Sequence, residues 1–234
     1  MIQETEAGTA MVGDERPYQL LIFDWDGTLM DSAARIVQCM HAAAQSVDAP
    51  LADEAAVRNI TGLSLEVAVP LLFAGLDAVR QQALIAEFRR QSLGREIQAA
   101  QLFDGVEAGL RELAGQGYQL AIATGKSRRG LDQDLAELGL AELFPITRTA
   151  DETFSKPHPR MLEEILTDYD QVAARALMIG DTEYDLQMAA NAGMAALAVS
   201  YGVHEPERLL KLQPKAVLDE FAQLPLWLKH GYSQ

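Results

Sequence analysis

Two pairs of acidic residues each come directly after a short apolar segment of this chain. Asp24 and Asp26 follow the segment LLIF, and Asp181 and Asp185 follow the segment ALMIG. Neighbouring carboxylates repel one another unless a cation compensates their charge, and Mg²⁺ prefers oxygen ligands of this kind. Either pair alone could be a polar turn, and Asp185 could be a helix cap. Two such pairs in one chain favour a shared cation, and we predict a Mg²⁺ site.

Two further polar segments contain residue types that bind phosphate. Thr124 follows the apolar segment YQLAIA and precedes Gly125 and Lys126, so that a hydroxyl and backbone N–H groups could hold phosphate oxygens. Lys156 lies in the loop SKPHP, where the prolines restrict the backbone and favour a defined position for the charge; a solvated surface lysine is the alternative. The formal net charge is −15, so an anionic substrate requires a local cation.

An alternation of predicted strands and helices positions these polar segments. Nearly continuous apolar segments predict strands at 18–23, 118–123, 176–180, 195–200 and 215–218. Helical periodicity predicts helices at 105–117, 128–139, 159–169 and 185–193. A further short strand at 144–148 is left open. The alternation predicts an α/β fold with a Rossmann-like, doubly wound parallel sheet. Because the carboxyl ends of parallel strands share one edge, we expect both acidic pairs to meet there.

The region after the first predicted strand has only helical patterns. Residues 33 to about 101 show no strand, which indicates an inserted all-helical domain; one continuous domain with an extra helical bundle is the alternative. We predict a flexible extension at 1–16, a Rossmann-like core at 17–31 and 102–225, a helical cap at 32–101 and a C-terminal tail at 226–234. The hinges are expected near Ser32 and Gln101–Leu102.

Composition and charge argue against several classes of protein. No apolar segment reaches the roughly 18 residues of a membrane span, and the acidic N-terminal segment lacks the apolar core of a secretory signal; Met11 could be an alternative start. The net charge of −15 argues against nucleic-acid binding. Cys39 is the only cysteine, so no internal disulfide can form, as is typical of a reducing cytoplasm. We expect a cytoplasmic monomer or homodimer without membrane or nucleic-acid partners.

Four motifs occur in order along the chain. They are DWDGT at 24–28, a threonine after a strand at Thr124, a lysine before proline at Lys156, and GDTEYD at 180–185. Together they resemble the motifs of the haloacid dehalogenase (HAD) superfamily, and within it the phosphoglycolate-phosphatase-like branch with a helical cap. The resemblance covers residues 18 to about 220. It implies a phosphatase that acts on a small phosphorylated metabolite.

The resemblance implies a catalytic role for each motif. Asp24 would be the nucleophile that forms an aspartyl phosphate. Asp26 would protonate the leaving alcohol and later deprotonate water. Thr124, Gly125 and Lys156 would bind the transferred phosphoryl group. Lys156 would also keep Asp24 ionised by lowering its pKa.

The same resemblance implies the metal ligands. Asp24 and Asp181 would bind Mg²⁺ through their carboxylates, Asp26 through its main-chain carbonyl, and Asp185 directly or through water. Phosphoryl transfer requires an aligned nucleophile and positive charge around the equatorial oxygens. Mg²⁺ and Lys156 would supply that charge.

Other activities of this superfamily fit the residues less well. Its carbon–halogen dehalogenases lack the second aspartate, which is present here as Asp26. Its hexose-phosphate mutases have a histidine where this chain has Ile36, and a basic residue in a cap loop that here reads TGLSLE. The expected activity is therefore hydrolysis of a small, phosphoglycolate-like phosphomonoester. A pyrophosphatase, a hexose-phosphate mutase and a non-catalytic phosphate-binding protein stay open as alternatives.

Substrate choice is expected to depend on the cap. The candidate specificity residues are Arg58, Thr61 and Gly62 in or beside the loop NITGLS, together with Lys126. A small phosphorylated acid such as phosphoglycolate requires a cation near its carboxylate. Arg58, Lys126 or Arg128 could provide it, and an ordinary surface position is the alternative for each.

Overall fold

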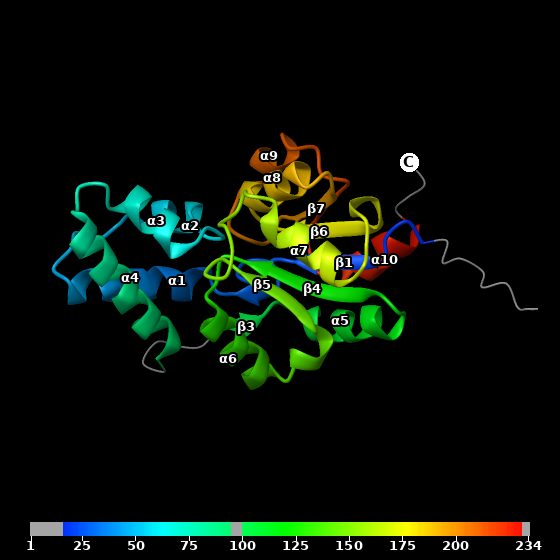
Figure 1. The fold of residues 1–234 in the computed structure, drawn as a ribbon, viewed down its shortest axis with the longest axis horizontal. Helices are drawn as coiled ribbons and strands as arrows, with labels where there is room; N and C mark the ends of the chain where they lie inside the picture. Colours follow the sequence, from blue (N-terminus) through cyan, green and yellow to red (C-terminus); the bar gives the residue numbers. More distant parts are fainter. Residues whose placement is uncertain (1–15, 95–99, 231–234) are drawn as a thin grey trace, which may run out of the picture.

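The computed structural model describes residues 16–94 and 100–230, and its centre is a parallel β-sheet (Figure 1). Six strands lie in the order β5-β4-β1-β6-β7-β8, and every neighbouring pair is parallel. The strands are β1 (Leu20–Phe23), β4 (Gln119–Thr124), β5 (Ile146–Thr149), β6 (Ala176–Gly180), β7 (Ala195–Val199) and β8 (Val217–Leu218). The predicted α/β class with a parallel sheet is confirmed, and β5 is the short strand that was left open.

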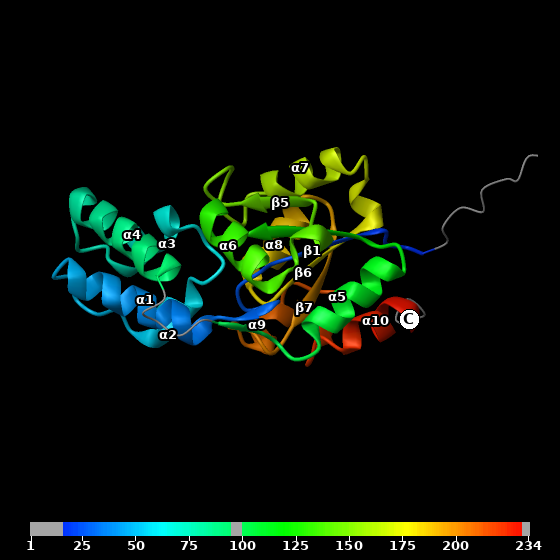
Figure 2. The ribbon, with the colours of Figure 1, turned by 90° about the horizontal axis from the view of Figure 1, so that it is seen from below.

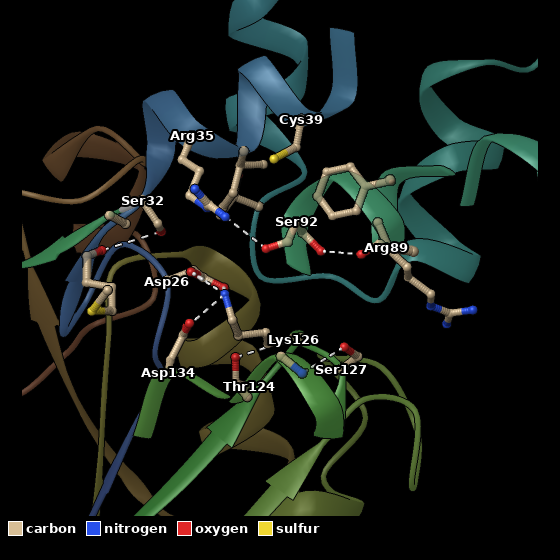
Figure 3. Close-up of a pocket in the computed structure, with 18 of the residues that line it drawn as sticks. Asp26, Ser32, Arg35, Cys39, Arg89, Ser92, Thr124, Lys126, Ser127 and Asp134 are labelled. Carbon is tan, nitrogen blue, oxygen red and sulfur yellow. Dashed lines mark hydrogen bonds and ion pairs between the residues drawn. The ribbon is translucent and has the colours of Figure 1, made fainter. Parts of the chain in front are cut away.

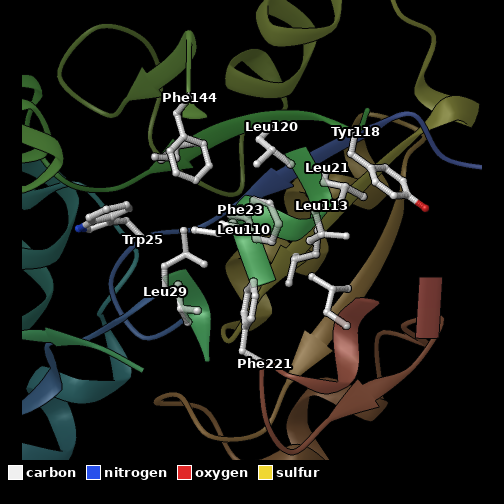
Figure 4. Packing of buried hydrophobic residues seen from close by; sticks show 14 of the residues in the cluster. Leu21, Phe23, Trp25, Leu29, Leu110, Leu113, Tyr118, Leu120, Phe144 and Phe221 are labelled. Atoms are coloured by element: carbon white, nitrogen blue, oxygen red, sulfur yellow. The ribbon is translucent and has the colours of Figure 1, made fainter. Parts of the chain in front are cut away.

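Helices cover both sides of the sheet because its strands are apolar on both faces. In β1, Leu21 and Phe23 belong to one hydrophobic cluster and Leu20 and Ile22 to another, since alternate residues of a strand point to opposite faces. The helices on the Phe23 side are α5 (Val106–Gly115), α6 (Arg128–Leu138) and α10 (Gln223–His230), and those on the other side are α7 (Arg160–Asp168) and α8 (Glu183–Asn191). Figure 2 shows α7 and α10 on opposite sides of the strands, and Figure 4 shows the packing around Phe23.

The remaining elements of the sheet region are short. They are α9 (Pro206–Leu210) and the 3₁₀ turns η1 (Ala141–Leu143) and η2 (Ala173–Arg175). In the described part of the chain, no helix combines the length and the apolar character that crossing a membrane requires.

Four helices between β1 and α5 have a hydrophobic core of their own. They are α1 (Ala33–Ser46), α2 (Glu54–Asn59), α3 (Leu65–Leu72) and α4 (Ala78–Leu93), and we call them the cap helices. Met40 of α1 and Leu84 and Ile85 of α4 are buried in this core, which shares no residue with the two clusters on the sheet. Figure 1 shows the cap helices to one side of the sheet. The absence of a strand within 33–94 agrees with the all-helical pattern of that region.

Two short strands that were not predicted link the cap helices to the sheet region. β2 (Met30–Asp31) and β3 (Gln101–Leu102) pair antiparallel, with Met30 opposite Leu102. Each has two residues, which is too short for an alternating pattern to be recognised. The pairing brings the two connections side by side where we predict the hinges. The division into core and cap stays a prediction.

Capping interactions explain where helices differ from their predicted positions. α8 begins at Glu183 rather than at 185, because Thr182 and Asp185 form a capping box in which each side chain accepts the other's backbone N–H. The unpredicted helix α2 has six residues and begins after Asp53, whose carboxylate accepts the N–H groups of Ala55 and Ala56. Both starts depend on hydrogen bonds that periodicity does not reveal.

The C-terminal helix packs against the sheet layer. α10 crosses the predicted start of the tail at 226, and its Leu224 and Leu228 lie in the same cluster as Phe23. Trp227 stacks on Tyr18 with ring centroids 6.4 Å apart. The segment 223–230 therefore packs on the sheet layer. The predicted extension lies outside the described residues except for Arg16.

Two leucines of α10 provide a test of this packing. Leu228 is 3% exposed and Leu226 is 64% exposed, so Leu228→Ala leaves a cavity and Leu226→Ala does not. We expect Leu228→Ala to lower the free energy of unfolding by about 2–4 kcal/mol, and Leu226→Ala by less than about 0.5 kcal/mol. Urea titration measures both. Equal effects of the two substitutions would contradict the packing of α10 on the sheet.

Candidate active site

The carboxyl ends of three adjacent strands bring the predicted residues together. β1 lies between β4 and β6 in the sheet, and Asp24, Thr124 and Asp181 lie at or just beyond the ends of these strands. All three side chains are buried. Lys156 reaches the same place from the loop between β5 and α7, and its Nζ lies 2.7 Å from Asp24 Oδ1. The polar segments therefore meet at this edge, as parallel strands require.

Three buried carboxylates and one buried ammonium group form the centre of the site. Asp24, Asp181 and Asp185 each offer an oxygen, and these oxygens all lie within 4.8 Å of one another. Lys156 Nζ lies 2.6 Å from Asp185 Oδ1. Neither carboxylate oxygen of Asp24 accepts a hydrogen bond of suitable geometry from a described residue. The oxygen ligands and the excess of negative charge fit a divalent cation.

Asp26 is not part of this carboxylate cluster. Lys126 Nζ lies 3.3 Å from Asp26 Oδ1 and 3.2 Å from Asp134 Oδ2, and Trp25 Nε1 donates a hydrogen bond to Asp134 at 2.9 Å. Figure 3 shows Lys126 between the two carboxylates. Burial lowers the pKa of Lys126, but Asp26 and Asp134 outweigh this effect and raise it. The charge of Lys126, a candidate substrate cation, is thus directed at two carboxylates of the protein itself.

Hydrogen bonds hold Asp181 and Asp185 in place. Thr28 Oγ1 donates to Asp181 Oδ1 at 2.8 Å, and the N–H of Val203 donates to Asp181 Oδ2 at 2.9 Å. Thr182 donates to Asp185 Oδ2 through its N–H at 3.0 Å and its Oγ1 at 2.7 Å. Sequence reasoning missed Thr28 and Val203 because contacts between distant segments leave no local pattern. Thr182 could have been found from the spacing T-x-x-D before a helix.

Glycine at position 27 allows the two acidic pairs to come close together. Gly27 has a φ of 91°, a conformation that favours glycine. A Cβ at this position would lie 2.3 Å from Asp181 Oδ2. The glycine of the motif DWDGT is therefore required for both the backbone conformation and the space that the Asp181 carboxylate occupies.

Among the protein's own groups, burial has the largest effect on the pKa values of Asp24 and Asp181. Desolvation raises the pKa of Asp24 well above its usual value; Lys156 opposes this rise, and Asp185 and Asp181 add to it. Desolvation and then Asp185 raise the pKa of Asp181 to about 7. Lys156 lowers the pKa of Asp24, as expected, and burial acts in the opposite direction. Further positive charge is needed to stabilise the ionised cluster.

The loop between α2 and α3 is docked on the sheet region. The N–H of Ser64 donates to Ser155 Oγ at 2.9 Å, and the Tyr184 hydroxyl donates to the main-chain oxygen of Asn59 at 3.0 Å. The His204 ring nitrogen Nε2 lies 3.0 Å from the same oxygen. The cap helices are therefore in contact with the carboxyl edge of the sheet through this loop.

The turn after β4 touches the same loop. A Cβ on Gly125 would lie 2.4 Å from the main-chain oxygen of Gly62, so the backbones approach too closely for any larger residue. Thr124 Oγ1 accepts the N–H of Lys126 at 3.2 Å. The predicted phosphate-binding turn and the predicted substrate loop thus form one continuous wall.

A cavity of about 550 Å³ lies between this wall, the cap helices and α6 (Figure 3). The predicted site residues that line it are Asp26, Thr61, Gly62, Thr124, Gly125 and Lys126. Of the specificity candidates, Arg58 is not among the lining residues. The cavity extends from the Asp26 end of the site into the cap helices.

Comparison with known protein families agrees with the motifs. A family model described as haloacid dehalogenase-like hydrolase matches residues 21–199. The protein named "Probable phosphatase IndB" from Dickeya dadantii is 36% identical over 210 residues, which are 88% of this chain and 91% of that protein. The phosphoglycolate phosphatase of Pectobacterium atrosepticum is 31% identical over 218 residues, which are 91% of this chain and 93% of that protein.

Solved structures share the fold. A haloacid dehalogenase-like hydrolase from Streptococcus pneumoniae has a TM-score of 0.79 at 25% identity and matches 90% of this chain and 98% of that chain. A "predicted phosphoglycolate phosphatase" from Haemophilus somnus has a TM-score of 0.81 at 23% identity and matches 91% of this chain and 99% of that chain. The family model and the curated relatives span most of the sequence, and the chain belongs to the haloacid dehalogenase-like hydrolase family.

Proposed function

We propose that this protein is a Mg²⁺-dependent phosphatase that hydrolyses a small phosphomonoester through an aspartyl phosphate on Asp24. The observation that carries the proposal is the buried contact of 2.7 Å between Asp24 and Lys156 beside two further buried carboxylates. Membership of the hydrolase family supports the reaction class. Relatives named phosphatase and phosphoglycolate phosphatase support a small phosphorylated substrate.

In the first step, a carboxylate oxygen of Asp24 attacks phosphorus and the bond between phosphorus and the leaving oxygen breaks. The carboxyl group of Asp26 gives its proton to the leaving alcohol. Lys156, together with the hydroxyl of Thr124 and the backbone N–H of Gly125, holds the phosphoryl oxygens. Asp26 suits this role because it lines the cavity in which a leaving group fits.

In the second step, water attacks phosphorus and Asp26, now a carboxylate, takes its proton. The bond between phosphorus and Asp24 breaks, which regenerates the Asp24 carboxylate and releases inorganic phosphate. Lys126 Nζ lies 3.3 Å from Asp26 Oδ1, and both residues line the cavity. When bound, Mg²⁺ supplies positive charge to the phosphoryl oxygens, and Asp24, Asp181 and Asp185, with the main-chain oxygen of Asp26, would hold it.

Removal of the nucleophile tests the mechanism. Asp24→Asn preserves size but replaces the attacking carboxylate by a much weaker nucleophile. We expect kcat to fall by at least about 10³-fold while the urea unfolding transition stays cooperative. Phosphate release is the measurement. Asp132→Asn on α6, whose side chain is 59% exposed, is the matched control and keeps full activity. Activity of Asp24→Asn equal to that of the control would exclude Asp24 as the nucleophile.

Removal of the metal tests the cofactor. EDTA should stop phosphate release, and excess Mg²⁺ should restore it. Mg²⁺ should also raise the melting temperature, because a ligand that binds only the folded state stabilises it. Asp181→Asn should lose this rise, and in EDTA it should be at least as stable as the wild type because one buried negative charge is gone. Undiminished turnover in EDTA would remove Mg²⁺ from the proposal.

Contact of the cap loop with the core gives a third test. We expect closure of the cap to exclude water during the first step. Gly125→Ala keeps the backbone N–H but places a methyl group 2.4 Å from the main-chain oxygen of Gly62, so the loop can no longer dock. The value of kcat/KM should fall at least about tenfold with little change in unfolding free energy. Gly115→Ala, where the new methyl group meets no atom within 4 Å, is the control. Equal activity of the two variants would show that docking is not needed.

A further inference from the structure

The cavity beside Asp26 has a size that can be compared with the leaving group. Its floor contains Asp26 and Thr124, and its walls belong to the cap helices and α6. Since Asp26 faces the leaving oxygen in the proposed reaction, the group released from phosphate occupies this cavity. The volume of about 550 Å³ lies within the range of about 300–1,000 Å³ found for sites that enclose drug-sized ligands. The two-carbon acid of phosphoglycolate would leave most of it unfilled.

This volume does not result from an open cap. The N–H of Ser64 bonds to Ser155 across the cap and sheet regions, and Tyr184 bonds to the main-chain oxygen of Asn59. At Gly125 the turn and the loop are already too close for a Cβ. The cavity therefore has this volume while the loop is docked, and backbone atoms block further closure at this contact.

The cap side of the cavity is mainly apolar. Ile36, Cys39 and Met40 come from the inner face of α1, and Leu65, Phe88 and Leu93 come from α3 and α4. Ile36 has an aliphatic side chain, so the wall presents no proton-transfer group at this position. Contact with this wall favours binding of an apolar ligand group, because apolar surface is removed from water. It does not favour binding of a second charged group, which would lose its hydration without gaining a partner.

The cations in the described part of the wall already contact acceptors of the protein. Lys126 faces Asp26 and Asp134. Arg89 forms an ion pair with Glu66. The guanidinium group of Arg35 donates to the main-chain oxygens of Ser92 at 2.9 Å and Gly94 at 3.2 Å. A substrate carboxylate would have to compete with protein carboxylates for Lys126 and Arg89, whereas the printed partners of Arg35 are neutral main-chain oxygens.

We infer that the preferred substrate is a phosphomonoester of an alcohol with an apolar body the size of an aromatic ring or larger, and not a phosphorylated two-carbon acid. The inference rests on the proposed phosphatase function and specifies its leaving group. Phosphate is bound at the carboxyl edge of the sheet, and the apolar body contacts Ile36, Cys39 and Phe88.

A homologous series of alkyl phosphates tests this inference. Ethyl, butyl and hexyl phosphate release alcohols of nearly equal acidity, so a difference in kcat/KM reports on contact with the apolar wall. Full burial of a methylene corresponds to an increase of about fourfold, and we expect hexyl phosphate to exceed ethyl phosphate at least about tenfold. Phosphoglycolate should be a poorer substrate than hexyl phosphate. All are assayed by phosphate release with excess Mg²⁺.

A charge placed in the wall provides a second measurement. Leu93→Lys introduces an ammonium group at the last residue of α4, where a positive charge is compatible with the helix end. We expect it to abolish the rise with chain length and to shift the ratio of kcat/KM for phosphoglycolate over hexyl phosphate at least about tenfold towards phosphoglycolate. Leu71→Lys, on α3 and 63% exposed outside the cavity, should keep the wild-type ratio.

The outcomes separate this inference from the proposed function. Turnover that does not rise with chain length, or a preference of the wild type for phosphoglycolate, would overturn the apolar leaving group and leave the phosphatase intact. Equal ratios in Leu93→Lys and Leu71→Lys would also overturn it, because the wall would then not contact the substrate. Absence of Mg²⁺-dependent phosphate release from every compound would remove the proposed function together with this inference.

Discussion

Lys156 is an ammonium group without solvent exposure, 2.7 Å from Asp24 and 2.6 Å from Asp185, and the geometry of the site depends on this contact. A buried charge is costly unless opposite charges surround it. The ends of β1 and β6 must therefore lie side by side, and the loop after β5 must reach across to them. Asp181 adds a third carboxylate and leaves negative charge in excess, which a divalent cation would offset. In this way an acidic protein can provide local positive charge for a phosphate group.

The parallel sheet provides the rigid base that such a cluster requires. β1 is apolar on both faces, so its end is fixed by packing from two layers, and Asp24 emerges where the strand stops. Gly27 then leaves room for the carboxylate of Asp181, which Thr28 holds by a hydrogen bond. The apolar strand and the acidic residues after it therefore act together. The strand positions the carboxylates, and the opposite charges around them lower the free-energy cost of their burial.

The cap helices and the sheet region contribute different chemistry. The sheet edge holds charges, and the cap helices, which have a separate hydrophobic core, supply apolar side chains. The two meet where the backbones of Gly62 and Gly125 touch. Lys126 lies at this boundary and is held by Asp26 and Asp134. Lys126 therefore lies between the charged end of the site and its apolar end. The proposed general acid, Asp26, is in contact with it and faces the cavity that the apolar side chains line.

The α/β class, the all-helical pattern of residues 33–94 and the four motifs could be predicted from the sequence, because periodicity and residue type are local properties. The contacts of Lys126 with Asp26, 100 residues away, and with Asp134 became visible only in the folded chain. The same holds for the environment of Asp24, where burial raises the pKa and Lys156 lowers it. The cavity was not predictable either. These features depend on desolvation and on distances between distant segments, which arise only when the sheet and the cap helices pack together.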